Sequence, residues 1–489
     1  MRDEKNPYFC RVRISRIIRQ SMTEEFQPYN VDELIERFEE MVEKEETYFF
    51  DVDQFEAIID HYFERNEVSM LKTAVHYAME QYPGNTMVHL KRARLLMLQG
   101  KYKRALKLLS DLEEIEPANT EIFYTKASLY SFQKQYKESV REYEKALLAG
   151  EDPDDIYISI AFEYENMGDY AMAIKYLKKV LRINPMHDAA IYELSFCFEI
   201  DNRLEEAVDF FDLFLSSYPY SKTAWFNLGI AYNQLDLYEK AVEAYDFSIA
   251  IEPGFSSAYF NKANSLANLD HYQAAIRVYR ETFEHEEPEA MTYYYIGECY
   301  EKMKKYEQAL KEYQQAIDVD DKLSEAWMGA GIAKDELGNT MEGIEFMEKA
   351  IKLEDINPEY WYILGDTQVK AGFHDKAKLS YGKVCELDPL NPDVWVDYAE
   401  LYTREGILDE GIALLNKGIE ADPRNASIMY RKAVYLIKQG KTKEAYATIE
   451  NALSIDFAKH TEIFEYMPLL KEDTQIVSMI EMHKVDKRK

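Results

Sequence analysis

The sequence predicts an all-α chain in which pairs of helices are repeated in tandem. Like residues recur every 34 positions, without insertion, from about residue 52 to residue 459, which makes twelve copies. Proline and glycine are few, at 14 and 18 of 489 residues, which argues against long linkers and against a turn-rich all-β protein. A chain of this length also exceeds the size of a single hydrophobic core, so we expect several domains or a repeat array.

Two columns of small residues run through the repeat. They are defined by Gly229 and Ala241 in the copy at residues 224–253, AWFNLGIAYNQLDLYEKAVEAYDFSIAIEP, and eleven of the twelve residues in the Ala241 column are small. A single small residue among bulky ones is typical of the point where two helices come closest, because a larger side chain would overpack the crossing by roughly 1–3 kcal/mol. We therefore expect the two helices of each pair to touch at these columns.

Aromatic and proline columns complete the pattern. All four tryptophans of the chain occupy one column: Trp225, Trp327, Trp361 and Trp395. Seven copies end with proline in the column of Pro253, where the missing N–H and the fixed φ end one helix before the next begins.

These columns resemble the tetratricopeptide repeat (TPR), whose pattern of Trp, Leu-Gly, Tyr, Ala, an aromatic residue and Pro over 34 positions is matched by residues 225–253. The resemblance covers about five-sixths of the chain. It implies a right-handed superhelical solenoid of antiparallel helix pairs with helical caps, and a non-enzymatic scaffold that binds proteins. The match is poorer in the first copy, which has Ile59 and Leu71 in the small columns, and at the end, where Phe457 replaces the proline.

The segments outside the array differ in charge. Residues 1–21 carry six basic and two acidic residues, and we expect a disordered arm or an extension upstream of a natural start at Met22; a basic arm that binds an acidic surface is the alternative. Residues 22–51 contain an acidic amphipathic helix after Asn30, expected to cap the array or to dock a basic partner. Residues 52–459 form the repeats, and residues 460–489 are expected to form capping helices and a short basic tail.

Composition limits the possible partners and compartments. The net charge of −32 repels phosphate backbones and anionic lipids, so we expect neither nucleic acid nor a membrane as partner, and a basic protein segment is favoured. No run of 18 apolar residues and no signal peptide is found, and the four cysteines lack the paired spacing of a zinc or dithiol site. These observations predict a cytoplasmic protein; the sequence leaves its oligomeric state open.

The sequence offers no chemistry for catalysis. The 81 residues outside the repeats leave no room for a catalytic domain, and neither an HExxH motif nor a phosphate-binding glycine loop is present. Cys197, Cys299 and Cys385 fall in core columns. We therefore expect no enzymatic activity, no catalytic residue, no cofactor and no metal ion. A regulatory or enzymatic module that acts on a basic protein substrate is the alternative.

One column of aromatic and apolar residues follows the tryptophan column and, by resemblance, borders the concave face. It is explained either by packing between repeats or by a groove in which rigid aromatic side chains anchor a ligand. In repeats six and seven, asparagines accompany this column, and an amide can pair with any peptide backbone. The predicted peptide-binding residues are Phe226, Asn227, Asn233, Phe260, Asn261, Asn264, Asn268 and Tyr294. We expect their amides to be partly exposed in the free protein.

Overall fold

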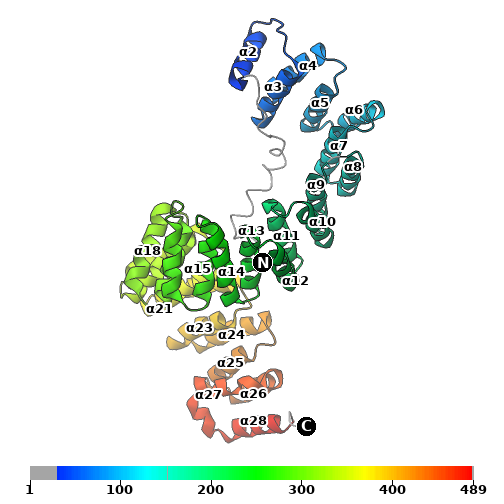
Figure 1. Cartoon of the computed structure of the whole chain (residues 1–489). Helices are drawn as coiled ribbons and strands as arrows, with labels where there is room; N and C mark the ends of the chain where they lie inside the picture. The colour runs from blue at the N-terminus through cyan, green and yellow to red at the C-terminus, as the bar shows by residue number, and fades with distance from the viewer. Residues whose placement is uncertain (1–29, 151, 487–489) are drawn as a thin grey trace. The chain divides into compact units, whose positions relative to one another are not determined.

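The computed structural model describes residues 30–150 and 152–486. These residues form α-helices and two short 3-10 helices and contain no β-strand, so the predicted all-α class is confirmed. The basic segment 1–21 lies outside the described residues. The chain divides into two compact units, Met1–Tyr218 and Pro219–Lys489, here called the first and the second unit (Figure 1).

The helices follow one another with short connections in both units. The first unit contains α2 (Val31–Glu43), α3 (Val52–Glu64), α4 (Val68–Gln81), α5 (Thr86–Leu98), α6 (Tyr102–Ile115), α7 (Thr120–Phe132), α8 (Tyr136–Leu148), α9 (Pro153–Asn166), α10 (Tyr170–Ile183), α11 (Asp188–Ile200) and α12 (Leu204–Ser217). The second unit contains α13 (Lys222–Gln234), α14 (Tyr238–Ile251), α15 (Ser256–Asn268), α16 (Tyr272–Thr282), α17 (Ala290–Lys302), α18 (Tyr306–Val319), α19 (Ser324–Glu336), α20 (Thr340–Leu353), α21 (Pro358–Lys370), α22 (His374–Leu387), α23 (Pro392–Arg404), α24 (Leu408–Ala421), α25 (Ala426–Lys438), α26 (Thr442–Ile455), η1 (Phe457–Thr461), α27 (Glu462–Tyr466), η2 (Pro468–Glu472) and α28 (Thr474–Asp486).

The two small columns lie where the helices of a pair cross, as predicted. A Cβ atom added at Gly229 would lie 2.5 Å from the ring of Tyr245 on the next helix. At Gly331 and Gly343 the backbones themselves meet, because a Cβ on either glycine would lie within 3.0 Å of the other's carbonyl oxygen. Ala241 is fully buried. A larger residue in either column would therefore force the paired helices apart.

The turn between the two helices of a pair is the same in all twelve repeats. One residue of each turn has a positive φ, and the twelve residues are spaced by 34 positions: Asn66, Gly100, Lys134, Gly168, Asn202, Asp236, Asp270, Lys304, Gly338, Gly372, Gly406 and Gly440. Left-handed backbone of this kind ends helices, and glycine adopts it without strain. The regular turns confirm twelve repeats in unbroken register.

In the four repeats that contain tryptophan, its side chain joins the helix pair to the loop that precedes it. The indole N–H of Trp225 donates to the carbonyl oxygen of Pro219 at 2.8 Å. The other three tryptophans make the same bond to the residue six positions earlier, at 2.8–2.9 Å. The ring of Trp225 also stacks on Phe247, with ring centroids 4.4 Å apart. The column therefore holds the inter-repeat loop as well as filling space between helices.

Helices outside the repeats cover both ends of the described chain. Asn30 caps α2, and its side chain accepts a hydrogen bond from the backbone N–H of Asp32. The buried face of α2, which includes Phe38, packs in one core with α3 and α4. At the other end, Ile463 and Ile476 share a core with Ile449 of α26. We propose that α2 and α27–α28 act as caps that bury the apolar faces of the terminal repeats.

Candidate functional site

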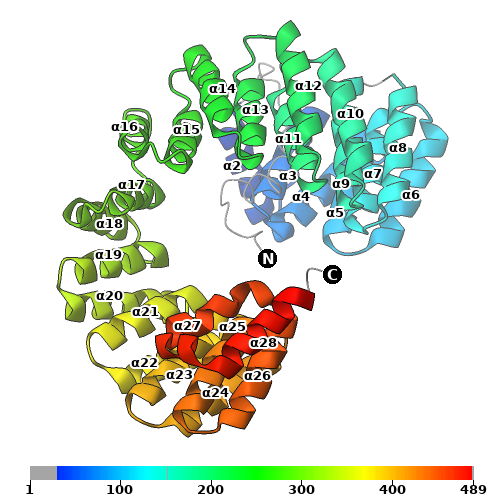
Figure 2. The ribbon, with the colours of Figure 1, turned by 90° about the horizontal axis from the view of Figure 1, so that it is seen from below.

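The inner face of the second unit is formed by its odd-numbered helices. These helices contact one another from repeat to repeat, for example α13 with α15, α17 with α19 and α23 with α25. In Figure 2, α15 and α17 lie on the inner side of the curve of this unit, and α16 and α18 lie on its outer side. All the predicted peptide-binding residues lie on α13, α15 and α17, three helices of this face.

The two predicted residues on the middle of α13 are buried. Phe226 is 7% exposed, and its ring lies 5.0 Å from the ring of Phe255 and 5.9 Å from that of Tyr245. Asn227 is 1% exposed, and its amide nitrogen donates to the carbonyl oxygen of Thr223 at 2.8 Å. The expected partial exposure of the Asn227 amide is therefore wrong, because the amide is packed between repeats and returns its N–H to its own helix.

The residues on α15 are more accessible. Asn261 is half-buried and donates from its amide nitrogen to the carbonyl oxygen of Ser257 at 2.8 Å, the same local bond that Asn227 makes. Asn264 is half-buried, and its amide oxygen accepts from the hydroxyl of Tyr279. Asn268, at the end of the helix, is exposed. The amides of α15 therefore lie at the surface of the inner face. Their bonds within the protein use some, but not all, of their hydrogen-bond donors and acceptors.

Two further contacts connect this surface to neighbouring helices. Asn233 at the end of α13 accepts a hydrogen bond at 2.8 Å from the hydroxyl of Ser265 on α15. The half-buried ring of Phe260 lies 5.6 Å from the ring of Tyr295 on α17, and Tyr294 lies beside Tyr295 at 5.4 Å. A continuous aromatic and amide surface therefore runs from α13 to α17.

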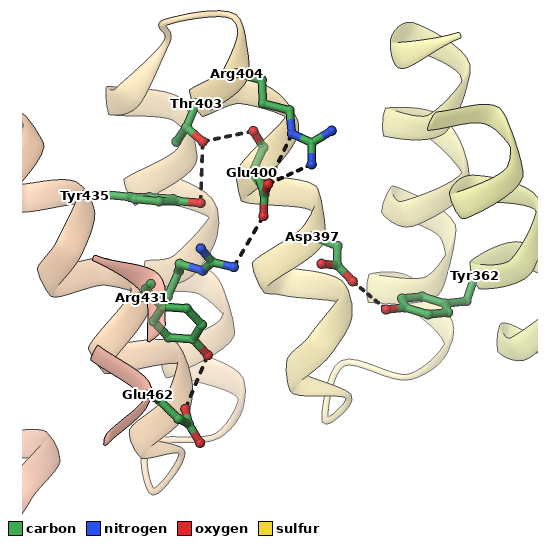
Figure 3. Close-up of polar contacts among 9 residues, drawn as sticks. Tyr362, Asp397, Glu400, Thr403, Arg404, Arg431, Tyr435 and Glu462 are labelled. Carbon is green, nitrogen blue, oxygen red and sulfur yellow. Dashed lines mark hydrogen bonds and ion pairs between the residues drawn. The ribbon is translucent and has the colours of Figure 1, made fainter. Parts of the chain in front are cut away.

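From the sequence, Glu298, Asp366 and Glu400 are expected to form an acidic rim on this face that favours a peptide with lysine or arginine. What sequence reasoning did not find is that several carboxylates of this face are hydrogen-bonded to tyrosines. Tyr381 donates to Asp366 at 2.6 Å, and Tyr313 donates to Glu301 at 2.8 Å. Tyr362 donates to Asp397 at 2.5 Å, as Figure 3 shows. Asp366 and Asp397 fall in the columns of Ile230 and Asn227, so the repeat alignment could have placed them on the inner face.

Burial raises the pKa of four carboxyl groups on this face. It raises the pKa of Glu298 and Glu301 on α17 and that of Asp366 on α21, and it raises the pKa of Asp397 together with the nearby negative charge of Asp366. Asp366 is exposed, whereas Glu298, Glu301 and Asp397 are half-buried. Among the described residues, no lysine or arginine forms an ion pair with these four carboxylates.

The next carboxylate along this face is neutralised. Glu400 on α23 lies 2.8 Å from the guanidinium of Arg404 and 3.3 Å from that of Arg431 on α25 (Figure 3). The guanidinium of Arg431 also lies over the ring of Tyr466, 4.0 Å from its centroid. In the described part of the chain, carboxylates without a cationic partner therefore lie on α17, α21 and α23, whereas on α19 the carboxylate of Asp335 lies 2.9 Å from the ammonium group of Lys370.

Carboxylates in this arrangement can attract a cation. A half-buried carboxylate without a positive partner attracts a cation more strongly than one in open water, because the local dielectric constant is lower. In residues 30–150 and 152–486, no group of three histidine, cysteine, aspartate or glutamate side chains is arranged to hold a metal ion. No helix in this part of the chain is long and apolar enough to cross a membrane.

The chain belongs to the tetratricopeptide repeat family. Four sequence models of this family match it, at residues 120–149, 154–187, 223–255, 259–322, 362–426 and 426–459, which together span more than half of its length. The resemblance stated from the columns is therefore confirmed. Members are repeat scaffolds that bind proteins or peptides, and the chain is a protein-interaction scaffold in this general sense.

Solved structures show local similarity to the chain. The C-terminal part of a TPR protein from Cytophaga hutchinsonii is 18% identical over 52% of this chain and 99% of that one, with a TM-score of 0.42. YrrB, described as a TPR protein with an unusual peptide-binding site, is 21% identical over 37% and 94%, with a TM-score of 0.32. The Cut9–Hcn1 hetero-tetramer of APC/C is 12% identical over 81% and 96%, with a TM-score of 0.39. A search of curated proteins found no match.

Proposed function

We propose that the inner face of the second unit binds an extended protein segment that carries lysine or arginine side chains. The observation that carries the proposal is a group of four carboxylates on α17, α21 and α23, three half-buried and one exposed, each with a raised pKa and none with an ion-pair partner among the described residues. The family supports a protein or peptide as the ligand, and the sign of the uncompensated charge supports a basic one.

The spacing of the helices suits an extended peptide. Stacked helices lie roughly 8–10 Å apart, close to the length of three residues of extended chain at about 3.3 Å each. A basic side chain at every third residue could therefore reach carboxylates on successive inner helices. Asp366 of α21 and Asp397 of α23 are the neighbouring pair that such a spacing would serve.

The aromatic and amide surface from α13 to α17 would hold the rest of the segment. Phe260 and Tyr294 offer contact area, and Asn261, Asn264 and Asn268 offer amides to the peptide backbone. We assign Phe226 and Asn227 a supporting role beneath this surface, because both are buried. Asn233 links α13 to α15 through Ser265, so it would position the surface.

A selection from a displayed library of random peptides against the immobilised full chain would test this proposal. We expect enrichment of extended sequences with lysine or arginine at intervals of three residues. Selection at raised salt should weaken binding without abolishing it, because screening acts mainly on exposed charges. Enrichment of acidic peptides, or of helical sequences with one apolar face, would contradict a basic extended ligand on this face.

A further inference from the structure

In the first unit, two repeats expose an apolar side chain at the last residue of the first helix, a position that is polar in most other repeats. Leu98 and Phe132 are the last residues of α5 and α7, and they are 43% and 68% exposed. Apart from Ile200, the other residues of their column are polar or charged: Glu64, Asn166, Gln234, Asn268, Lys302, Glu336, Lys370, Arg404 and Lys438. Because α5 contacts α7, the two apolar side chains lie in neighbouring repeats at one edge of the unit.

Basic side chains surround these two residues. Residues 91–110 include seven basic and no acidic residues, although the chain as a whole carries a net charge of −32. Lys103 and Arg104 are exposed at the start of α6, and Lys137 is exposed at the start of α8. Within the part of the chain that the structure describes, none of the three has a carboxylate partner. These three positive charges are therefore unpaired among the residues that the structure describes.

The fold brings the apolar and the basic groups together. The rings of Tyr102 and Phe132 lie 6.3 Å apart, which places the start of α6 beside the end of α7. The start of α8 follows Phe132 after a short turn, in which Lys134 has a positive φ. The turn-edge patch consists of Leu98, Tyr102, Lys103, Arg104, Phe132 and Lys137.

We propose that the turn-edge patch binds an acidic segment of a partner protein that carries a bulky apolar side chain. The ammonium and guanidinium groups would pair with its carboxylates, and Phe132 with Leu98 would cover its apolar side chain. Phosphate backbones fit less well, because the large negative charge of the chain repels a long polyanion beyond the patch. The turn-edge patch lies on the first unit and would bind an acidic segment, whereas the inner face of the second unit is proposed to bind a basic one. The two proposals are therefore independent.

The test measures binding of a fluorescein-labelled peptide of glutamates with one central phenylalanine to the full chain, by fluorescence anisotropy at low salt. Lys103→Glu with Lys137→Glu should weaken binding by about tenfold or more, since attraction becomes repulsion. Phe132→Ser should weaken it several-fold through lost apolar contact. The control is Lys443→Glu, an exposed lysine in the same column on α26, where the preceding helix ends with Lys438; it should leave binding unchanged.

Other outcomes would overturn the proposal, provided that circular dichroism shows each variant to be folded. Absence of binding by the wild type, or an equal loss in Lys443→Glu, would remove the assigned site. Equal competition by an oligothymidylate would show a general polyanion surface. Self-association of the wild type that Lys103→Glu with Lys137→Glu abolishes in sedimentation experiments would show that a second copy occupies the patch.

Discussion

At the scale of single residues, this fold depends on contacts between a small residue on one helix and a large residue on the helix paired with it. Gly229, Gly297 and Gly365 each face a tyrosine ring on the paired helix, and an added Cβ would lie 2.5–2.6 Å from that ring. Because a buried aromatic ring cannot yield without moving its helix, the glycine fixes how closely the two helices approach. The sequence predicted the small columns, but the facing tyrosine follows only from the three-dimensional crossing.

Gly229→Ala should therefore destabilise the chain by about 1–3 kcal/mol, because the new Cβ overlaps the ring of Tyr245. The matched control is Gly254→Ala, since no atom lies within 4 Å of the corresponding Cβ in the loop after α14. Thermal or urea unfolding monitored by circular dichroism measures both. Equal stability of the two variants would mean that the helices of this pair can separate without loss.

At the scale of helices, the proline column that ends many helix pairs was recognised in the sequence, but the column of side chains that cap the first helix of a pair was not. The side chains that cap the first helix of many repeats share one column: Asn85, Asn119, His187, Ser221, Asn357, Asn391 and Asn425. Each accepts a hydrogen bond from a backbone N–H of the first turn, which contributes on the order of 1 kcal/mol. This column could have been predicted from the same 34-residue alignment.

The partners of the carboxylates could not be predicted in this way. Asp366 bonds to a tyrosine on the second helix of its own pair, whereas Asp397 bonds to Tyr362 in the preceding repeat. Whether the tyrosine partner comes from the same helix pair or from the preceding repeat depends on how closely the helices approach one another. A column of residue types gives no information on that distance. The burial of Asn227 was missed for the same reason, because the column shows residue type and not depth.

Between α21 and α23, these carboxylates should make stability depend on pH in a defined direction. A raised pKa means that the folded chain takes up a proton before the unfolded chain does. The ionised carboxylate therefore lowers the free energy of unfolding at any pH above the raised pKa. This destabilisation is relieved as the pH falls toward the ordinary carboxyl range near about 4. Asp397→Asn, which retains an acceptor for Tyr362, should unfold at the same or a higher temperature than the wild type at pH 7. This difference should shrink on acidification.

Thermal unfolding at pH 7 and at mildly acidic pH checks this expectation. Glu420→Gln, at an exposed carboxylate on α24, is the control and should show no such trend. A lower unfolding temperature for Asp397→Asn at pH 7, with no dependence on pH, would show that the ionised carboxylate stabilises the free protein. The inference that burial of the ionised Asp397 carboxylate destabilises the folded chain would then be wrong.

At the scale of the whole molecule, the sequence predicted the class and the number of repeats because each repeat obeys the same local rules. The division after Tyr218 was not predicted, since the 34-residue period crosses it without insertion. The net charge of −32 indicated a basic partner in general terms, but total charge does not locate a site. The repeat columns had already indicated the inner face of repeats six and seven, with Glu298, Asp366 and Glu400 as an acidic rim. The structure adds that Asp397 belongs to this group, that Asp366 and Asp397 form no ion pair among the described residues, and that Glu400 is paired with two arginines.

The most direct test of that candidate is calorimetric titration of the full chain with an extended peptide that has lysine at every third position. We compare the wild type with Asp366→Asn combined with Asp397→Asn, and use the same peptide with glutamates as the control ligand. We expect micromolar or tighter binding by the wild type, about tenfold or more weaker binding by the double variant, and no loss of thermal stability in that variant. Equal affinity of the two proteins for the lysine peptide, or tighter binding of the glutamate peptide, would contradict it.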